Sequence, residues 1–96
     1  MGRDKLKRNL QITPICKEFS SKKCNEKNTI YLLHEESEAL YLMDNQGLYQ
    51  AQAALKMGVS RATFARIIKS AREKVSMMLV TGAKLIIEDD KDNYRH

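Results

Sequence analysis

The feature that most constrains this chain is a pair of helical segments separated by a very short turn. Apolar residues recur at spacings of three and four on both sides of Gly58, which is the pattern of amphipathic helices. Gly58 can adopt the left-handed conformation that ends a helix, and Ser60 is a favourable N-cap for the next one. We therefore expect one helix from Tyr49 to Met57 and a longer one from Ser60 to about Thr81, turned sharply against each other.

The residues within this pair have the spacing of a helix-turn-helix unit. Ala54 is small where the two helices would cross, and Gly58 reverses the chain. Val59 and Phe64 are apolar just after the turn and inside the second helix, as such a unit requires. A glycine between two helices is a weak signal by itself, but the cap at Ser60 and the basic second helix strengthen it. The expected fold class is mainly α: a helix-turn-helix with a small two-stranded β element.

Shorter elements flank the helix pair. Glu36–Asn45 has the composition of a short helix, whose acidic first turn complements the positive end of the helix dipole. Thr29–Leu33 and Ala83–Glu88 are strand candidates, and we expect them to pair with each other. The predicted division is a basic, irregular N-terminal arm over 1–28, a helix-turn-helix domain over 29–88 and a polar C-terminal tail over 89–96.

The positive charge of the chain lies in two blocks. The net charge is +5, but residues 1–28 and residues 49–75 each carry +5, whereas residues 29–48 carry −4 and residues 76–96 carry −1. Clustered basic residues indicate a polyanionic partner, with nucleic acid the first candidate, although solvated surface charge is an equally simple explanation of the charge alone.

The second helix has one apolar face and one basic face. At about 100° per residue, the core-facing stripe contains Phe64, Ile67, Ile68, Ala71, Val75 and Met78, and the same spacing extends to Leu79. On the other side, small residues near the helix start would permit close approach to a major groove, and Arg66 could reach base edges. The other basic and polar side chains could contact phosphates. The candidate DNA-binding residues are Gln50, Arg61, Ala62, Thr63, Ala65, Arg66, Lys69 and Arg72.

These residues carry a resemblance to a known family. The segment GLYQAQAALKMGVSRATFARIIKSAREKV, with EALYLMD before it and GAKLII after it, is similar to uncharacterised protein family 0251. The resemblance runs from about Ile30 to Ile87, and Arg61, Thr63, Phe64 and Arg66 match its strongest block. It implies a small prokaryotic protein with a helix-turn-helix like region four of sigma factors, for which DNA binding is predicted. The chain departs from the family pattern at His34, at Ser37 and at Asp89–Asp90.

The expected function is therefore sequence-specific binding of double-stranded DNA by a transcriptional regulator. One such unit buries only about 600–1,000 Å² of protein surface, so we expect a homodimer or a second anchor. Leu85, Ile86 and Ile87 could form either a dimer contact or a strand. The alternative function is a protein-interaction module that docks on RNA polymerase or another regulator through a helix-turn-helix-shaped surface.

Other classes of function lack their usual signals in this sequence. Neither a nucleophile–base pair nor a phosphate-binding glycine loop is present, so we expect no enzyme and no cofactor. Cys16, Cys24, His34 and His96 lack the spacing of a metal site, although a thiol-responsive regulator that uses both cysteines stays open. No apolar run is long enough for a membrane span or a signal sequence. The expected location is the cytoplasm, in association with the nucleoid.

Overall fold

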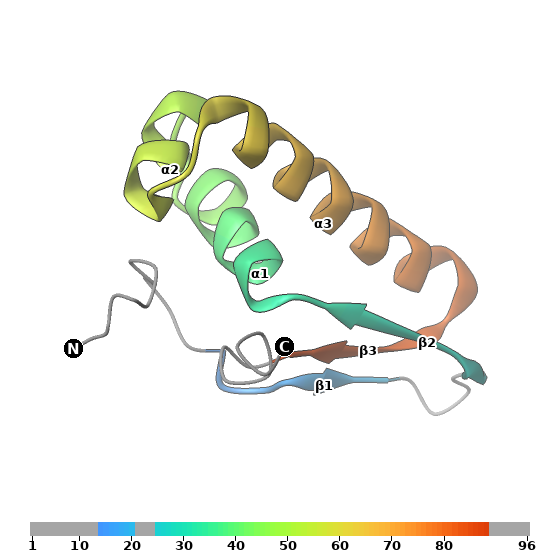
Figure 1. Ribbon diagram of the computed structural model, residues 1–96. Coiled ribbons are helices and arrows are strands. Elements are labelled where there is room, and N and C mark those ends of the chain that lie inside the picture. The colour runs from blue at the N-terminus through green and yellow to red at the C-terminus, as the bar shows by residue number, and fades with distance from the viewer. Residues whose placement is uncertain (1–13, 21–24, 89–96) are drawn as a thin grey trace, which may run out of the picture.

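A computed structural model describes residues 14–20 and 25–88 of the chain, without the side chains of residues 25–27. The elements in chain order are β1 (Glu18–Phe19), β2 (Asn25–Leu32), α1 (His34–Leu40), the π-helix η1 (Tyr41–Asn45), α2 (Gln50–Met57), α3 (Arg61–Thr81) and β3 (Ala83–Ile87). The helical regions lie on one side of a small sheet: α1, η1 and α2 gather at one end of the molecule, and the longest helix, α3, runs from that end across the sheet (Figure 1).

The ends of α2 and α3 follow from local sequence signals. Gly58 ends α2 with a φ of 72°, and Gly82 ends α3 with a φ of 74°, both in the left-handed region that favours glycine. The Ser60 hydroxyl accepts a hydrogen bond from the Thr63 N–H at 3.1 Å, as an N-cap does. The predictions of two helices, a short turn between them and their capping residues are confirmed.

The first helical region extends two residues beyond its predicted start. It begins at His34 rather than at Glu36, because the Glu36 carboxylate accepts a hydrogen bond from the Leu33 N–H at 2.8 Å and caps the helix start. After Leu40 the backbone hydrogen bonds join residues five apart instead of four, which is the π pattern. The Gln46 N–H donates to the Tyr41 carbonyl at 2.8 Å. No residue pattern in this segment predicts the π-helix.

The sheet has three strands in the order β1-β3-β2, one more than the sequence predicted. The predicted pairing is confirmed, since Ile30 lies opposite Leu85 and Leu32 opposite Ile87 in a parallel arrangement. The other edge of β3 pairs antiparallel with β1, where Phe19 lies opposite Leu85. A two-residue strand has no alternating pattern that a sequence could reveal.

This third strand corrects the predicted N-terminal boundary. Residues 18–19 and 25–28 lie in strands, so the interpretation of 1–28 as an irregular arm is wrong for them, and β2 continues across the expected boundary at residue 29. Residues 1–13 and the predicted tail, 89–96, lie outside the described residues. The apolar run Leu85–Ile87 belongs to the central strand, where Leu85 and Ile87 are buried. The sequence left two interpretations of this run, a dimer contact or a strand, and the structure shows that it forms a strand.

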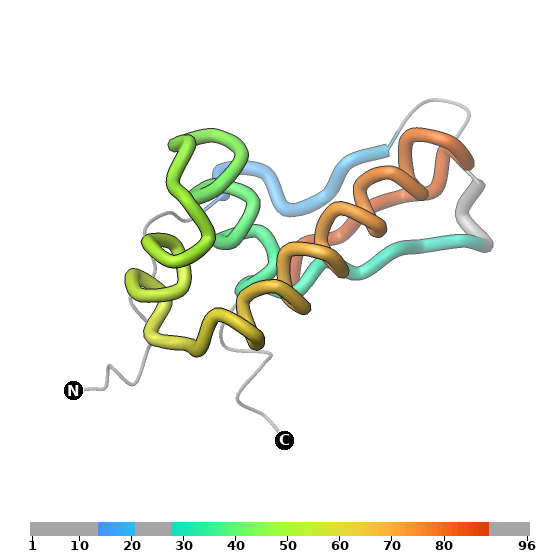
Figure 2. The backbone as a smooth tube through the Cα atoms, turned by 90° about the horizontal axis from the view of Figure 1, so that it is seen from above, coloured from blue at the N-terminus to red at the C-terminus, as the bar shows by residue number. Residues whose placement is uncertain are grey.

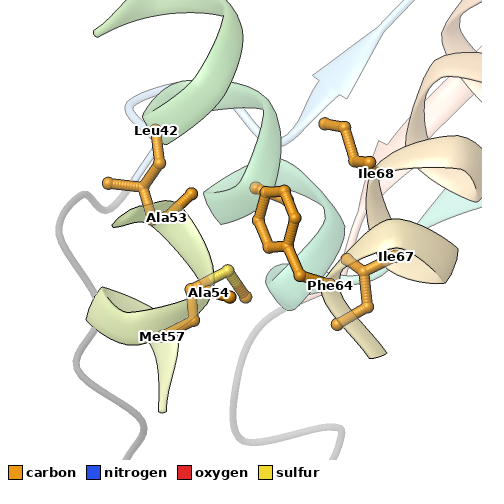
Figure 3. Packing of buried hydrophobic residues seen from close by; sticks show 8 residues of the cluster. Leu42, Ala53, Ala54, Met57, Phe64, Ile67 and Ile68 are labelled. Carbon is orange, nitrogen blue, oxygen red and sulfur yellow. The ribbon is translucent and has the colours of Figure 1, made fainter. Parts of the chain in front are cut away.

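Two apolar clusters meet along α3. Phe64, Ile67 and Ile68 pack against α1, η1 and α2, and Figure 3 shows the Phe64 ring between these helices. Further along α3, Ala71 packs against the sheet, which Figure 2 shows beneath the C-terminal half of the helix. The first cluster contains Ala39, Leu42, Ala53, Ala54, Met57, Phe64, Ile67 and Ile68, and the second contains Leu32, Ala71, Leu85 and Ile87.

The predicted apolar stripe of α3 is buried in its first half and partly buried in its second. Val75 and Met78 are half-buried, whereas Leu79, to which the spacing of the stripe extends, is 75% exposed. Leu79 lies at the margin of the stripe when residues advance by about 100°. Since it is in the last turn of the helix, few neighbours reach it.

Candidate nucleic-acid interface

The first two turns of α3 carry five of the eight candidate residues. Arg61, Ala62 and Arg66 are exposed, and Thr63 and Ala65 are half-buried beside them. Phe64 and Ile67, in the same two turns, are buried, and their packing determines which side of the helix faces outward. The structure therefore places small and basic side chains together on the open side of the start of α3.

Arg61 and Arg66 have no ion-pair partner among the residues that the structure describes. The other basic residues on α3 each contact an acidic residue of the chain. A guanidinium without an internal carboxylate partner keeps its five N–H donors for an external acceptor, such as a phosphate or a guanine edge. Arg61 and Arg66 are thus the two α3 cations with the greatest freedom to bind a ligand.

Lys69 lies one turn beyond Arg66 and pairs with Glu73. The Lys69 Nζ donates to Glu73 Oε2 at 2.7 Å, and this hydrogen bond raises the pKa of the lysine. Both side chains are largely exposed, so solvent screens the attraction between them and the pair contributes little to stability. A phosphate could therefore replace Glu73 at small cost.

Arg72 makes a different contact from the one that the sequence suggested. Its guanidinium binds the Asp44 carboxylate of η1 through two bonds, Nε to Oδ2 at 3.1 Å and Nη2 to Oδ1 at 2.5 Å. The hydrogen bond from Arg72 is the main reason that the pKa of Asp44 lies below its ordinary value. This bidentate pair fastens η1 to α3, so the residue has a structural contact within the chain.

Gln50 begins α2 and is half-buried. The adjacent Tyr49 N–H donates to the Gln52 side chain at 3.0 Å, which caps the helix start. The sequence also contained a cation that we did not select. Lys56 is exposed in the last turn of α2, four residues before Ser60, and it extends the basic character of the helix pair.

Glu36 is the residue whose role the sequence analysis missed. It is only 3% exposed, and its Oε1 accepts hydrogen bonds from the Leu33 N–H and the Lys74 Nζ, each at 2.8 Å. Its Oε2 accepts from the Ser70 hydroxyl at 2.6 Å. Lys74 also donates to the Tyr31 carbonyl at 2.8 Å. Glu36 thus joins the start of α1 to the middle of α3, and Lys74 joins α3 to β2, whereas the sequence neighbours of Glu36 had suggested only a favourable interaction with the helix dipole.

The remaining sequence features have a limited structural context. Cys16 is an exposed free thiol, and Cys24 lies outside the described residues. Among the residues that are described, no three His, Cys, Asp or Glu side chains are grouped as a metal site would require. Within the same ranges, no helix has the length and apolarity needed to cross a bilayer.

The chain matches one family over nearly its whole length. The family described as "Protein of unknown function DUF134" matches residues 1–95. A UPF0251 protein of Thermococcus kodakarensis is 52% identical over 64% of this chain and 54% of its own length. A UPF0251 protein of Vibrio parahaemolyticus is 48% identical over 67% of each chain, and one of Syntrophobacter fumaroxidans is 40% identical over 91% of this chain and 57% of its own.

The matched segment spans about half the length of most of these curated relatives. No solved structure matches the chain.

Proposed function

The chain belongs to the family described as "Protein of unknown function DUF134", and from this premise we propose that it binds double-stranded DNA sequence-specifically and regulates transcription. The observation that carries the proposal is the start of α3, where Arg61 and Arg66 are exposed next to small side chains and have no carboxylate partner within residues 14–20 and 25–88. We propose no catalytic activity for the protein, and we propose that it acts in the cytoplasm, bound to the nucleoid.

The first turns of α3 would enter the major groove, which accommodates one α-helix. Ala62 would allow the helix to approach the bases closely, because its side chain is a single methyl group on the exposed face. Arg66 lies one turn further and would bind the O6 and N7 atoms of a guanine through two hydrogen bonds, the commonest specific contact in this groove.

Contacts to the DNA backbone would come from the flanking residues. Lys69 would exchange its exposed pair with Glu73 for a phosphate, and Arg61 and Thr63 would contact the backbone near the helix start. Gln50, at the start of α2, would donate to a phosphate on the groove wall. Arg72 would act indirectly by holding η1 against α3 through Asp44.

The experiment compares two variants that remove one positive charge each from neighbouring turns. After selection of a preferred sequence from random DNA, binding is measured by fluorescence anisotropy over a salt series. Arg66→Ala should weaken specific binding by about 5- to 150-fold and relax the preference at one base pair. Lys69→Ala should weaken binding equally to all sequences and reduce the salt slope by about 0.9.

Either of two results would overturn the proposal. One is wild-type protein that binds no DNA at low salt. The other is Arg66→Ala protein that keeps the affinity and sequence preference of the wild type.

A second candidate function is docking on a protein of the transcription machinery, such as RNA polymerase. The observation that favours it is at α2, where Tyr49, just before the helix, and Leu55, within it, are 78% and 79% exposed. Exposed aromatic and aliphatic side chains are typical of the centre of protein interfaces. This function predicts binding to the polymerase that changes little with salt and is lost in Leu55→Ala, with no sequence preference for DNA.

A further inference from the structure

Glu73 is the only acidic residue in the basic block that contains the helix pair. Residues 49–75 carry six Lys and Arg side chains and this single carboxylate. The Glu73 side chain is 66% exposed and forms an ion pair with Lys69, whose side chain is 75% exposed. The carboxylate therefore lies in solvent, within the part of the chain that we propose binds a polyanion.

Glu73 lies on the same side of α3 as Arg66. At about 100° per residue, their separation in the helix brings the two residues to within about 20° of each other around the axis and about 10 Å along it. Lys69 lies between them along the helix. The Debye length is about 10 Å at 0.1 M salt, so the Glu73 carboxylate repels a phosphate that approaches Lys69 or Arg66.

The contact with Glu73 occupies the ammonium group of Lys69. The Nζ atom donates to Oε2 at 2.7 Å, and this hydrogen bond is the main reason that the pKa of Lys69 lies above its ordinary value. A carboxylate offers an ammonium group the same kind of partner as a phosphate, because both present anionic oxygens as acceptors. In the free protein, Glu73 thus takes the place at Lys69 that a DNA phosphate would take.

Helix stability is a weak explanation of this pair. An ion pair four residues apart stabilises a helix more when the acidic residue comes first, and here Lys69 precedes Glu73. Both side chains are exposed, so solvent also screens the attraction. The next two cations of α3 differ, because Arg72 and Lys74 bind carboxylates of other elements and join α3 to η1 and α1. The Lys69–Glu73 pair connects two residues of the same helix and fastens no other element.

We propose that Glu73 regulates the DNA-binding surface as an internal competitor of DNA for Lys69. The carboxylate holds the ammonium group in the free protein, and a backbone phosphate must displace it when DNA binds. This role rests on the proposed function. Because Glu73 competes with phosphates and not with bases, it lowers the affinity for every sequence by the same factor and leaves the preference set by Arg66 unchanged.

Weaker backbone binding suits a protein that must find one sequence among many. Phosphate contacts supply essentially all of the affinity for random DNA, and stronger contacts lengthen the stay at incorrect sites. Arg61 and Arg66 have no carboxylate partner among the described residues, so this competition acts on the outer contact at Lys69. Glu73 therefore limits backbone binding without occupying the residue that we propose reads a base.

The test measures DNA binding of the full chain by fluorescence anisotropy with the variant Glu73→Gln, which removes the charge and keeps the shape of the side chain. At low salt the variant should bind both the selected sequence and random DNA about 2- to 5-fold more tightly than the wild type. The gain should shrink as the salt concentration rises, because salt screens the carboxylate.

Glu18→Gln is the matched control. It removes the same charge from another exposed carboxylate, which pairs with Lys84 at 3.3 Å in the sheet. The net charge therefore changes equally in both variants, and only the position of the charge differs. Glu18→Gln should change the affinity for DNA by less than about 1.5-fold. Circular dichroism checks that both variants fold like the wild type.

The variant Lys69→Ala separates competition from simple repulsion. Without the ammonium group, Glu73 has no cation to withhold from DNA at this position, so adding Glu73→Gln to Lys69→Ala should raise the affinity little. An equal gain with and without Lys69 would mean that Glu73 repels DNA without competing for the lysine, which overturns the proposal.

Three results with the single variants would also overturn it. The first is Glu73→Gln protein that binds DNA no more tightly than the wild type. The second is a gain no larger than that of Glu18→Gln. The third is a gain for the selected sequence alone, because a competitor for phosphates acts on all sequences.

Inorganic polyphosphate, as a second probe, separates the role of Glu73 from the proposed function. Sequence-specific binding by the wild type without any gain in Glu73→Gln would remove this role and leave the proposed function intact. Protein that binds no DNA but binds polyphosphate, more tightly in Glu73→Gln, would remove the proposed function and leave the competition of Glu73 with phosphate. Binding of neither polyanion would overturn both.

Discussion

The two halves of α3 are parts of one continuous helix, yet they differ in what they bury and in what they expose. The N-terminal half buries Phe64 and Ile67 among other helices and exposes basic side chains. The C-terminal half lies over a sheet and exposes apolar side chains, of which Val80 is the most exposed. Only Ala71 of the C-terminal half is fully buried, so the two halves are held by contacts of unequal depth.

This difference gives one helix two unlike surfaces. The half that packs deeply on α1, η1 and α2 presents its polar side in an orientation that its buried side chains hold. The half that rests on the sheet has apolar side chains beyond those that the sheet can cover. Glu36 and Lys74 join the halves near the middle of the helix, where the two clusters meet.

The largest effect on this comparison is expected from the centre of the helical cluster. Phe64→Ala should lower the free energy of unfolding by about 4 kcal/mol, because the ring is fully buried and its loss leaves a cavity. Leu85→Ala, in the sheet cluster, should cost about 3 kcal/mol. Chemical denaturation measures both values. If the order were reversed, the sheet rather than the helices would be the deeper anchor of α3.

The contact between the halves should have the next largest effect. Glu36→Gln removes the charge that Lys74 faces and weakens the bonds to Leu33 and Ser70. We expect a loss of about 2 kcal/mol, below the 3–5 kcal/mol of fully buried pairs, because the lysine side chain is 30% exposed.

A double-mutant cycle with Lys74→Met isolates the ion pair from the other bonds of Glu36. Amide exchange should also show faster opening in both halves of α3 in Glu36→Gln. Faster exchange in one half alone would mean that Glu36 does not couple them.

The cap of α3 tests the N-terminal half alone. Ser60→Ala removes the acceptor of the Thr63 N–H and should cost about 1 kcal/mol. Thermal denaturation measures the loss, and Ser76→Ala, at an exposed position of the same helix, is the control. A loss in Ser60→Ala no larger than that in Ser76→Ala would contradict the capping role of Ser60.

The smallest expected effect is that of the pair between Asp44 and Arg72. Both side chains are more than two-fifths exposed, so Asp44→Asn should cost at most about 0.5 kcal/mol at neutral pH. Because Arg72 holds the pKa of Asp44 in the folded protein below its ordinary value of 3.8, this stabilisation is complete above that value and is lost as the pH falls through the lower, folded-state pKa.

Denaturation at several pH values from neutral downward measures this contribution. The stability curves of Asp44→Asn and wild-type protein should converge at the acid end. A difference that persists there would show that the pair is not the source of the effect.

Local signals explain most of what the sequence predicted correctly. Gly58, Ser60 and Gly82 act within one helix turn, so their roles at the ends of α2 and α3 could be assigned without tertiary structure. The pairing of β2 with β3 was also expected, because both are short β-favouring runs, but its parallel direction was not predicted.

The features that the sequence did not predict depend on distant partners. Glu36 binds Lys74 and Ser70, which follow it by 38 and 34 residues, and Arg72 binds Asp44 at a separation of 28. No spacing rule connects such residues. The strand β1 depends equally on the open edge of β3. The eight candidate residues are all exposed or half-buried, but only the folded chain shows that Arg72 has an internal partner.

The position of β3 at the centre of the sheet has a consequence for synthesis on the ribosome. The strand is the last described element of the chain, yet both β1 and β2 depend on it for their hydrogen bonds. Residues 83–87 are synthesised after both other strands, so the hydrogen bonds that join β1 and β2 to β3 form only after Ile87 has been added to the chain. The buried residues of the helical cluster all lie within residues 39–68, so they are synthesised before the strand that completes the sheet.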